Sequence, residues 1–120
     1  MSKKFVNFSN LHTNKWPQDR MDAVYKLIDD GEIVNVSFPI LSADAKDEEV
    51  VATVKRAVDK VLDLNPDIVF CQGEFAMCFK AVTLLKAKGI KVITVCNERI
   101  ISKEDGKTIS GFKFVQFREY

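Results

Sequence analysis

Polar side chains able to bind an anion or a nucleotide follow three apolar segments of the chain. Serine, asparagine and glutamine side chains donate hydrogen bonds to phosphate or ribose, and arginine holds phosphate through two parallel hydrogen bonds. Histidine can transfer a proton near neutral pH. The candidates occupy residues 9–16, 72–75 and 97–99: Ser9, Asn10, His12, Lys15, Trp16, Gln72, Gly73, Glu74, Phe75, Asn97 and Arg99. Their types favour a site for a small anionic ligand.

The residues near Gly73 also have ordinary structural interpretations. A glycine between a strand and a helix can simply permit a tight turn, or it can let phosphate or ribose approach backbone N–H groups at the helix start. Glu74 stabilises a helix start, which argues against a phosphate placed there, but its carboxylate could take a ribose hydroxyl or an adenine amine. Ser9 and Asn10 can cap or turn the chain, or donate to an anion or nucleobase.

The charged and aromatic candidates have the same two kinds of interpretation. His12 is either a structural or solvated histidine, or a general acid or base. Lys15 beside Trp16 is either a cation resting on a packed ring, or a phosphate contact next to a platform for a base. Arg99 can pair with Glu98 or Glu119, or it can hold phosphate.

Several motifs with known chemistry are absent from the sequence. There is no G-x-G-x-x-G after the first strand, no G-x-x-x-x-G-K-[ST] and no G-x-S-x-G. The cysteines, Cys71, Cys78 and Cys96, form no C-x-x-C pair, and with a single histidine they indicate buried free thiols, not a zinc site. We therefore expect no cofactor and no metal, and any catalysis would use positioning and charge stabilisation.

The hydrophobic pattern predicts strands that alternate with helices. Strands are expected over residues 4–9, 32–38, 67–71 and 90–96, followed by a hairpin over 98–102 and 112–117 with its turn at 104–107. Helices are expected from Pro17 to Gly31, from the acidic residues 44–49 to Leu62, and over 74–88. In the last helix Phe75, Phe79, Val82 and Leu85 are expected to face inward.

This alternation predicts an α/β fold, a Rossmann-like three-layer sandwich with a mainly parallel sheet of order 2-1-3-4 and a C-terminal β-hairpin. In such folds ligands bind beyond the carboxyl ends of the strands, here between strands one and three. Within the hairpin's second strand, Phe112 and Phe114 are expected on one face, and Lys113, Val115 and Phe117 on the other.

Length and charge limit the classes of function. With 120 residues the chain is expected to form a single domain over residues 1–120. Eighteen Lys and Arg residues against seventeen Asp and Glu residues leave a net charge of +1, which excludes long DNA or RNA held by bulk charge. No apolar run reaches the length of a membrane span, and no signal peptide is evident, so a cytoplasmic protein is expected.

Four segments of the sequence together resemble a known family: Phe5–Asn10, Val69–Phe75, Asn97–Arg99 and Phe112–Tyr120. They resemble small stand-alone CRISPR-associated proteins related to the CARF domain, some of which are ring nucleases that cut cyclic oligoadenylate messengers in antiviral defence. The resemblance implies a Rossmann-like homodimer with cyclic tetra-adenylate across its two-fold axis. It also implies that a ribose 2′-OH attacks the neighbouring phosphate without a metal.

Transferred by position, the resemblance implies roles for particular residues. Ser9 and Asn10 would contact phosphate or ribose, and residues 72–74 would line the floor of the site. Arg99 or Lys15 would stabilise the transition state, and His12 would be the general acid or base. Ser9, His12 and Arg99 are thus the expected catalytic residues, and Trp16, Phe75 and Asn97 complete the expected ligand contacts. Two alternatives stay open: a non-catalytic nucleotide-binding sensor or sponge, and an interaction module without a ligand.

Overall fold

Strands and helices alternate along the chain, as the hydrophobic pattern predicts. The computed structural model describes residues 2–120. Its elements, in chain order, are β1 (Lys4–Phe8), the short 3-10 helix η1 (Thr13–Lys15), α1 (Gln18–Ile28), β2 (Glu32–Val36), α2 (Asp47–Leu62), β3 (Ile68–Cys71), α3 (Phe75–Ala87), β4 (Lys91–Glu104) and β5 (Lys107–Glu119).

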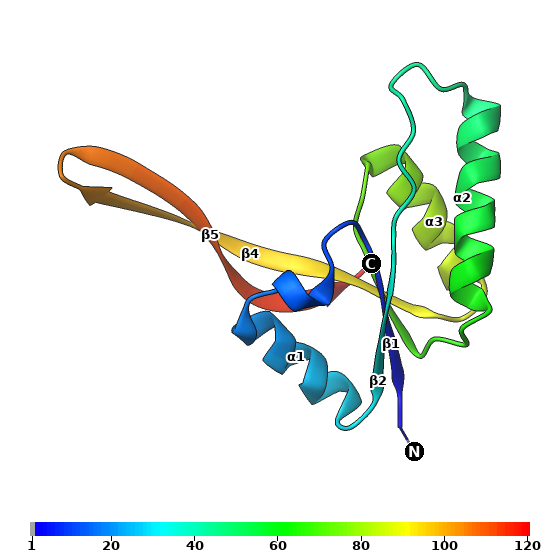
Figure 1. Ribbon diagram of the computed structural model, residues 1–120, viewed down its shortest axis with the longest axis horizontal. Helices are drawn as coiled ribbons and strands as arrows, with labels where there is room; N and C mark the ends of the chain where they lie inside the picture. Colours follow the sequence, from blue (N-terminus) through cyan, green and yellow to red (C-terminus); the bar gives the residue numbers. More distant parts are fainter. Residues whose placement is uncertain (1) are drawn as a thin grey trace.

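The strands form one sheet of order β2-β1-β3-β4-β5. The pairs β1–β2, β1–β3 and β3–β4 are parallel, and β4–β5 is antiparallel. Helix α1 lies on one face of the sheet, and α2 and α3 lie on the other (Figure 1). The predicted α/β class, the strand order 2-1-3-4 and the antiparallel C-terminal hairpin are confirmed, and the arrangement is consistent with a Rossmann-like fold.

Two apolar clusters hold the helices against the sheet. On one face Val6 and Phe8 of β1 pack with α2 and α3, where the valine stripe of α2 is buried as its helical spacing predicts. On the other face Phe5 packs with Trp16, Phe70 and α1. Alternate β1 residues thus enter opposite clusters, so this central strand anchors both layers.

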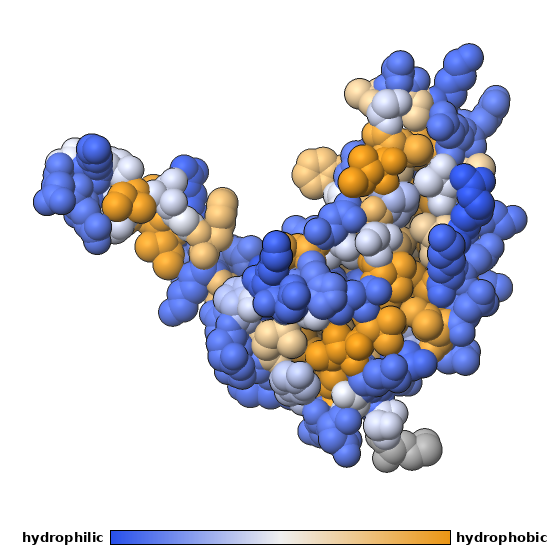
Figure 2. Space-filling model, viewed as in Figure 1, coloured by the Kyte–Doolittle hydropathy of each residue, from blue (hydrophilic) through white to orange (hydrophobic). Residues whose placement is uncertain are grey.

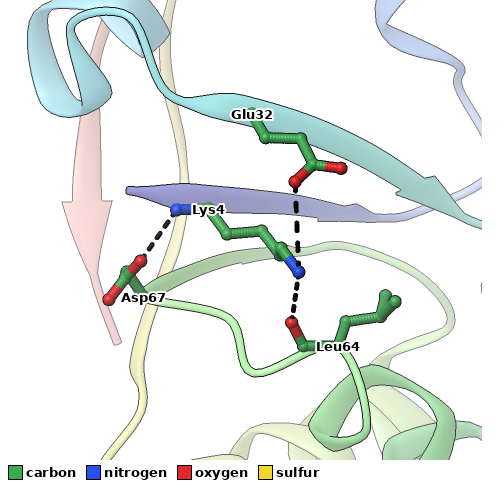
Figure 3. Close-up of polar contacts among 4 residues, drawn as sticks. All are labelled: Lys4, Glu32, Leu64 and Asp67. Carbon is green, nitrogen blue, oxygen red and sulfur yellow. Dashed lines mark hydrogen bonds and ion pairs between the residues drawn. The ribbon is translucent and has the colours of Figure 1, made fainter. Parts of the chain in front are cut away.

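The amino ends of three elements converge on Lys4 (Figure 3). Its backbone N–H donates to the Asp67 carboxylate at 2.7 Å, and its ammonium donates to the Leu64 carbonyl at 2.7 Å. The ammonium also lies 4.0 Å from a Glu32 carboxylate oxygen. Because these groups are partly exposed, the ion pair adds little stability, and the contacts mainly align β1 with β2 and with the segment entering β3.

Strand β4 is longer than the sequence pattern predicts. The sequence pattern predicts a break between a strand over residues 90–96 and another over 98–102, but β4 continues unbroken to Glu104 and pairs with β5 from Ile93 onward. The expected fourth strand and first hairpin strand are therefore one strand, and residues 2–120 contain five strands instead of six. The tight turn does fall at 104–107, where Asp105 and Gly106 both have positive φ, as a two-residue hairpin loop requires.

The faces of β5 also differ from expectation. A β-bulge lies between two successive pairings, Cys96 with Gln116 and Asn97 with Phe114, so Val115 has no partner in β4. The extra residue restores Phe117 to the same face as Phe114, with ring centroids 5.1 Å apart. The prediction that Phe117 faces away from Phe114 is wrong because strict alternation fails across a bulge.

Helix α3 buries a different stripe from the one predicted. Met77, Cys78, Ala81, Val82 and Leu85 are buried, whereas Phe75 is 93% exposed and Phe79 is 73% exposed. The inward prediction is correct for Val82 and Leu85 and wrong for the two phenylalanines. Apolar residues surround the first two turns of α3, so their spacing alone does not identify the buried face.

The outer part of the β4–β5 hairpin extends away from the rest of the molecule (Figure 1). We call residues 97–114 the arm. The radius of gyration of 16.1 Å exceeds the value of about 14 Å expected for a compact domain of this length. The arm exposes large apolar side chains, among them Ile101 and Phe112, and Figure 2 shows apolar groups at its surface. An isolated two-stranded hairpin is only marginally stable in water, so these side chains favour a covering partner.

Gly31, in the turn between α1 and β2, has no room for a side chain. A Cβ placed there would lie 2.0 Å from the Lys3 carbonyl oxygen and 2.9 Å from that of Ile28. We expect Gly31→Ala to lower the free energy of unfolding by about 1–3 kcal/mol, as overpacking does. Gly111→Ala is the control, since nothing lies within 4 Å of its added Cβ, and it should change stability by less than about 0.5 kcal/mol. Urea denaturation measures both, and equal stabilities would contradict the close approach.

Candidate functional site

The carboxyl ends of β1 and β3 meet at a shallow hollow of about 240 Å³. Ser9, Asn10 and Leu11 line it from β1, and Gln72 and Gly73 line it from β3. The Gln72 N–H donates to the Phe8 carbonyl at 3.2 Å, which continues the β1–β3 pairing into the site. We call this the edge hollow. The structure therefore brings together candidates from two of the three predicted segments, because parallel neighbours end at the same edge.

A second hollow of about 230 Å³ adjoins the edge hollow, since Ser9 and Asn10 line both. His12, Asn35, Val36 and Ser37 complete it, so its other wall is the carboxyl end of β2. Asn10 is exposed where the two hollows meet, which leaves its amide free to contact a ligand.

A buried asparagine organises the loop that carries these residues. The Asn7 amide nitrogen donates to the Leu11 carbonyl and to Asn35 Oδ1, both at 2.8 Å, while its oxygen accepts from the Ser9 hydroxyl at 2.7 Å. Asn35 in turn bonds the Thr13 N–H and hydroxyl, each at 3.0 Å. We call this set the Asn7 network. It fixes the path of residues 9–13 by satisfying polar groups that would otherwise be buried without partners.

The network engages Ser9 directly. Ser9 is buried, and its hydroxyl hydrogen is donated to Asn7. Its oxygen can still accept a hydrogen bond, as it does weakly from the Leu11 N–H at 3.4 Å. The arrangement suits a positioning role for Ser9 more than that of a group ready to attack a substrate.

His12 lies exposed at the start of η1. Its Nδ1 accepts from the Asn14 N–H at 3.1 Å and so caps that short helix. The neutral ring therefore carries its proton on Nε2, which has no partner among residues 2–120. The structural and the catalytic interpretation compete here, because the cap occupies the lone pair of Nδ1, the one nitrogen of the neutral ring that can accept a proton.

Gly73 and Glu74 have clear structural roles. A Cβ on Gly73 would lie 2.3 Å from Cδ1 of the buried Phe38 ring, so packing alone requires a glycine there. The Glu74 side chain caps α3 by accepting from the N–H groups of Ala76 at 2.5 Å and Met77 at 3.1 Å. The carboxylate is thereby committed to the helix start, and a ligand would have to compete with it.

Trp16 is part of the core and cannot serve as a platform for a base. It is 6% exposed, its ring packs against Phe5 and Phe70, and its indole N–H donates to the Leu11 carbonyl at 3.0 Å. The Arg20 guanidinium lies over the ring, 4.9 Å from its centroid. Lys15, its neighbour, is exposed, and so is Phe75. Of the two aromatic candidates, Phe75 is thus the exposed one; it follows Glu74 at the start of α3 and does not line the edge hollow itself.

Asn97 and Arg99 lie on the arm, opposite Phe114 and Phe112. Strand β4 pairs with β3 only as far as Ile93 and then carries both residues outward (Figure 1). The structure does not bring them to the edge hollow of the same chain. Their position after the fourth apolar segment suggested a site loop, but that segment continues as a strand.

Three residues that organise the structure around the site are not among the residues predicted from the sequence: Asn7, Asn35 and Arg20. Each asparagine occupies a strand position between apolar residues, which is an available signal of a buried polar contact. Arg20 lies between the rings of Trp16 and Phe114, and burial lowers the pKa of its guanidinium. It joins α1 to the base of the arm.

Within residues 2–120, no three histidine, cysteine or carboxylate side chains lie close enough together to hold a metal ion. Over the same residues, no helix is both long enough and apolar enough to cross a membrane.

The fold and the edge hollow define an α/β protein with a polar site where its parallel strands end. The chain belongs to the family described as "Uncharacterized protein MJ1673 family", whose sequence model matches residues 3–118. No curated protein matches the chain. The family match therefore covers the body and the arm together, and its description names no activity.

If the Asn7 network organises the loop, removing the Asn7 amide should lower the stability of the protein. Asn7→Leu keeps the side-chain size but removes the acceptor of the Ser9 hydroxyl and one of the two donors to Asn35 Oδ1, which keeps only the Thr13 N–H. We expect the free energy of unfolding to fall by about 1–3 kcal/mol. Hydrogen exchange of residues 9–13 should also accelerate, since the loop loses its anchor.

Asn14→Leu is the matched control, because Asn14 is exposed in the same loop. It should change stability by less than about 0.5 kcal/mol. If both variants unfold at the same urea concentration, the network does not organise the loop.

Proposed function

We propose that this chain is a CRISPR-associated ring nuclease with a Rossmann-like, CARF-related domain. It would bind cyclic tetra-adenylate as a cytoplasmic homodimer and cleave it without a metal. One observation carries the proposal: two of the four segments that resemble ring nucleases, Phe5–Asn10 and Val69–Phe75, meet at the edge hollow. Segments 65 or so residues apart in sequence thus share one site, as a common ligand would require.

Binding would use neutral donors and one aromatic face. The Asn10 and Gln72 amides and the Ser9 oxygen suit ribose and phosphate oxygens or a base edge. Phe75 is exposed next to Gly73 and Glu74, and an adenine stacked on it would gain about 1–3 kcal/mol. These contacts account for recognition without a strongly basic surface.

Cleavage would be an internal transfer within the ring. The 2′-oxygen bonds to the neighbouring phosphorus, the bond from phosphorus to the 5′-oxygen breaks, and a 2′,3′-cyclic phosphate and a 5′-hydroxyl result. A proton leaves the 2′-hydroxyl and another is delivered to the 5′-oxygen. Release of His12 from its cap on η1 would free Nδ1 to accept the proton of the 2′-hydroxyl, and Ser9 and Asn10 would orient the phosphate.

If Arg99 stabilises the charge on the transition state, the site requires a second copy of this chain. Arg99 lies on the arm, which extends beyond the body of its own chain, so it can serve a site only across a dimer. Two-fold symmetry also places each exposed cation, such as Lys15, twice around one ligand. A net charge of +1 per chain is then no obstacle to an anionic ring.

A non-catalytic sensor or sponge is the second candidate. It is favoured by the commitment of several polar groups: the Ser9 hydroxyl bonds Asn7, the Glu74 carboxylate caps α3, and Arg99 lies away from the hollow. An interaction module without a ligand is the third, favoured by the exposed apolar arm.

The first test is incubation of the purified protein with cyclic tetra-adenylate in EDTA, followed by chromatography. We expect linear products ending in 2′,3′-cyclic phosphate. Intact ligand that co-elutes with the protein would reject the nuclease and support the sensor. No binding and no cleavage of any cyclic oligoadenylate would reject both.

The Phe75 platform predicts a specific loss of affinity. Phe75→Ala should raise the Kd for cyclic tetra-adenylate by about 5- to 150-fold, which corresponds to the loss of one stacked base. Phe79→Ala is the control: it removes an exposed phenylalanine one turn farther along α3 from Gly73. Isothermal titration measures both, and equal affinities would remove Phe75 from the site.

The homodimer predicts a dependence on the arm. The wild-type chain should be dimeric at micromolar concentration by light scattering. Phe112→Ser should weaken the dimer at least about ten-fold, because it removes a large exposed ring from a buried interface. Lys113→Ser, on the opposite face of β5, is the control. A monomeric wild-type protein would contradict the dimer.

A further inference from the structure

The most unusual pair of reactive groups in the molecule lies beside the edge hollow and takes no part in the proposed reaction. The sulfur atoms of Cys71 and Cys78 are 3.7 Å apart. Cys71 is the last residue of β3, and Cys78 lies in the first turn of α3. The turn between them contains Gln72 and Gly73, which line the hollow.

We propose that Cys71 and Cys78 are an oxidation site, at which a hydroperoxide converts the two thiols into a disulfide that closes a ring over residues 71–78. A disulfide has a sulfur–sulfur distance of about 2.05 Å, so the sulfurs must approach by about 1.7 Å. The two residues belong to adjoining elements joined by a short turn, and side-chain rotation with a small shift of that turn can supply this movement.

The surroundings give the two thiols different roles. Cys78 lies near the N-terminus of α3, where the helix dipole favours a thiolate. A hydrogen bond from Cys71, together with one from the Gly73 backbone, lowers the pKa of Cys78 to about 6, although burial and the Glu74 charge oppose this. The hydrogen bond to Cys78 and burial raise the pKa of Cys71. Cys78 is therefore the nucleophile and Cys71 the resolving thiol.

The exposure of the two cysteines also indicates that Cys78 reacts before Cys71. Cys71 is fully buried, whereas Cys78 is 7% exposed. The Tyr120 hydroxyl covers the pair: it donates to the Cys71 carbonyl at 2.7 Å and lies 3.4 Å from the Cys78 sulfur. An oxidant that enters beside Tyr120 meets Cys78 first.

The reaction balances with a peroxide as the oxidant. The Cys78 thiolate attacks one peroxide oxygen, the O–O bond breaks, and Cys78 becomes a sulfenic acid while the other oxygen takes up a proton to form water or an alcohol. The Cys71 sulfur then attacks the Cys78 sulfur, the S–O bond breaks, and the Cys71 proton leaves with the hydroxide as water. The two thiols supply the two electrons that reduce the peroxide.

The test is peptide mapping of the folded wild-type protein after exposure to hydrogen peroxide, followed by denaturation and alkylation of the remaining thiols. Both cysteines fall on one tryptic peptide, residues 61–80, and cleavage after Glu74 separates them. We expect the two fragments to stay joined until a reductant is added. Fragments that separate, each carrying an alkylated thiol, would overturn the proposal, as would a link from either residue to Cys96.

Two variants test the order of reaction. In Cys71→Ala the Cys78 sulfenic acid has no resolving thiol, so dimedone should trap it. In Cys78→Ala dimedone should label Cys71 at least ten-fold less. Equal labelling would overturn the assignment of Cys78 as nucleophile. Because the map uses the wild-type chain and contains no nucleotide, it holds whether or not the variants fold and whether or not the protein binds cyclic oligoadenylate.

Discussion

The hydrogen bonding of one buried amide, that of Asn7, is the constraint on which the carboxyl edge of the sheet depends. A polar side chain in the central strand of a packed sheet is destabilising unless every donor and acceptor finds a partner. The β1–α1 loop and β2 supply those partners through the Leu11 carbonyl, Ser9 and Asn35. The hydrogen bonds of Asn7 thus hold the β1–α1 loop against β1 and β2 beside the edge hollow. They give the loop a definite shape although it has little regular structure.

Much of the fold could be predicted because its signals are periodic and local. The spacing of Val54, Val58 and Val61 identifies the buried stripe of α2, and the alternation of strands with helices predicts the parallel sheet. The errors arise where local pattern carries no information about pairing. Because Val115 is an extra residue in β5, the side chains on its two sides do not follow one regular alternation. The start of α3 is apolar all round, so its sequence does not show that Met77 is buried and Phe75 is exposed.

The strand order could predict which segments of the chain meet at the candidate site. Ser9 and Gln72 come together because β1 and β3 are parallel neighbours, which the strand order already implies. Side-chain roles were less accessible, because they depend on contacts distant in sequence. Gly73 is required by Phe38, and Trp16 is enclosed by Phe5 and Phe70. Such residues resemble ligand contacts in sequence because packing and recognition select the same residue types.

The bulge at Val115 separates the geometry of the arm from that of the body. In a β-strand the side chains change sides at every residue, so a single insertion or deletion reverses all positions on one side of it. The bulge absorbs such a reversal here: five residue steps separate Phe112 from Phe117, whereas four separate their partners Arg99 and Val95. Deleting Val115 would therefore remove the bulge and leave Phe112 opposite Arg99, so the join between arm and body can change its shape while the arm presents the same surface.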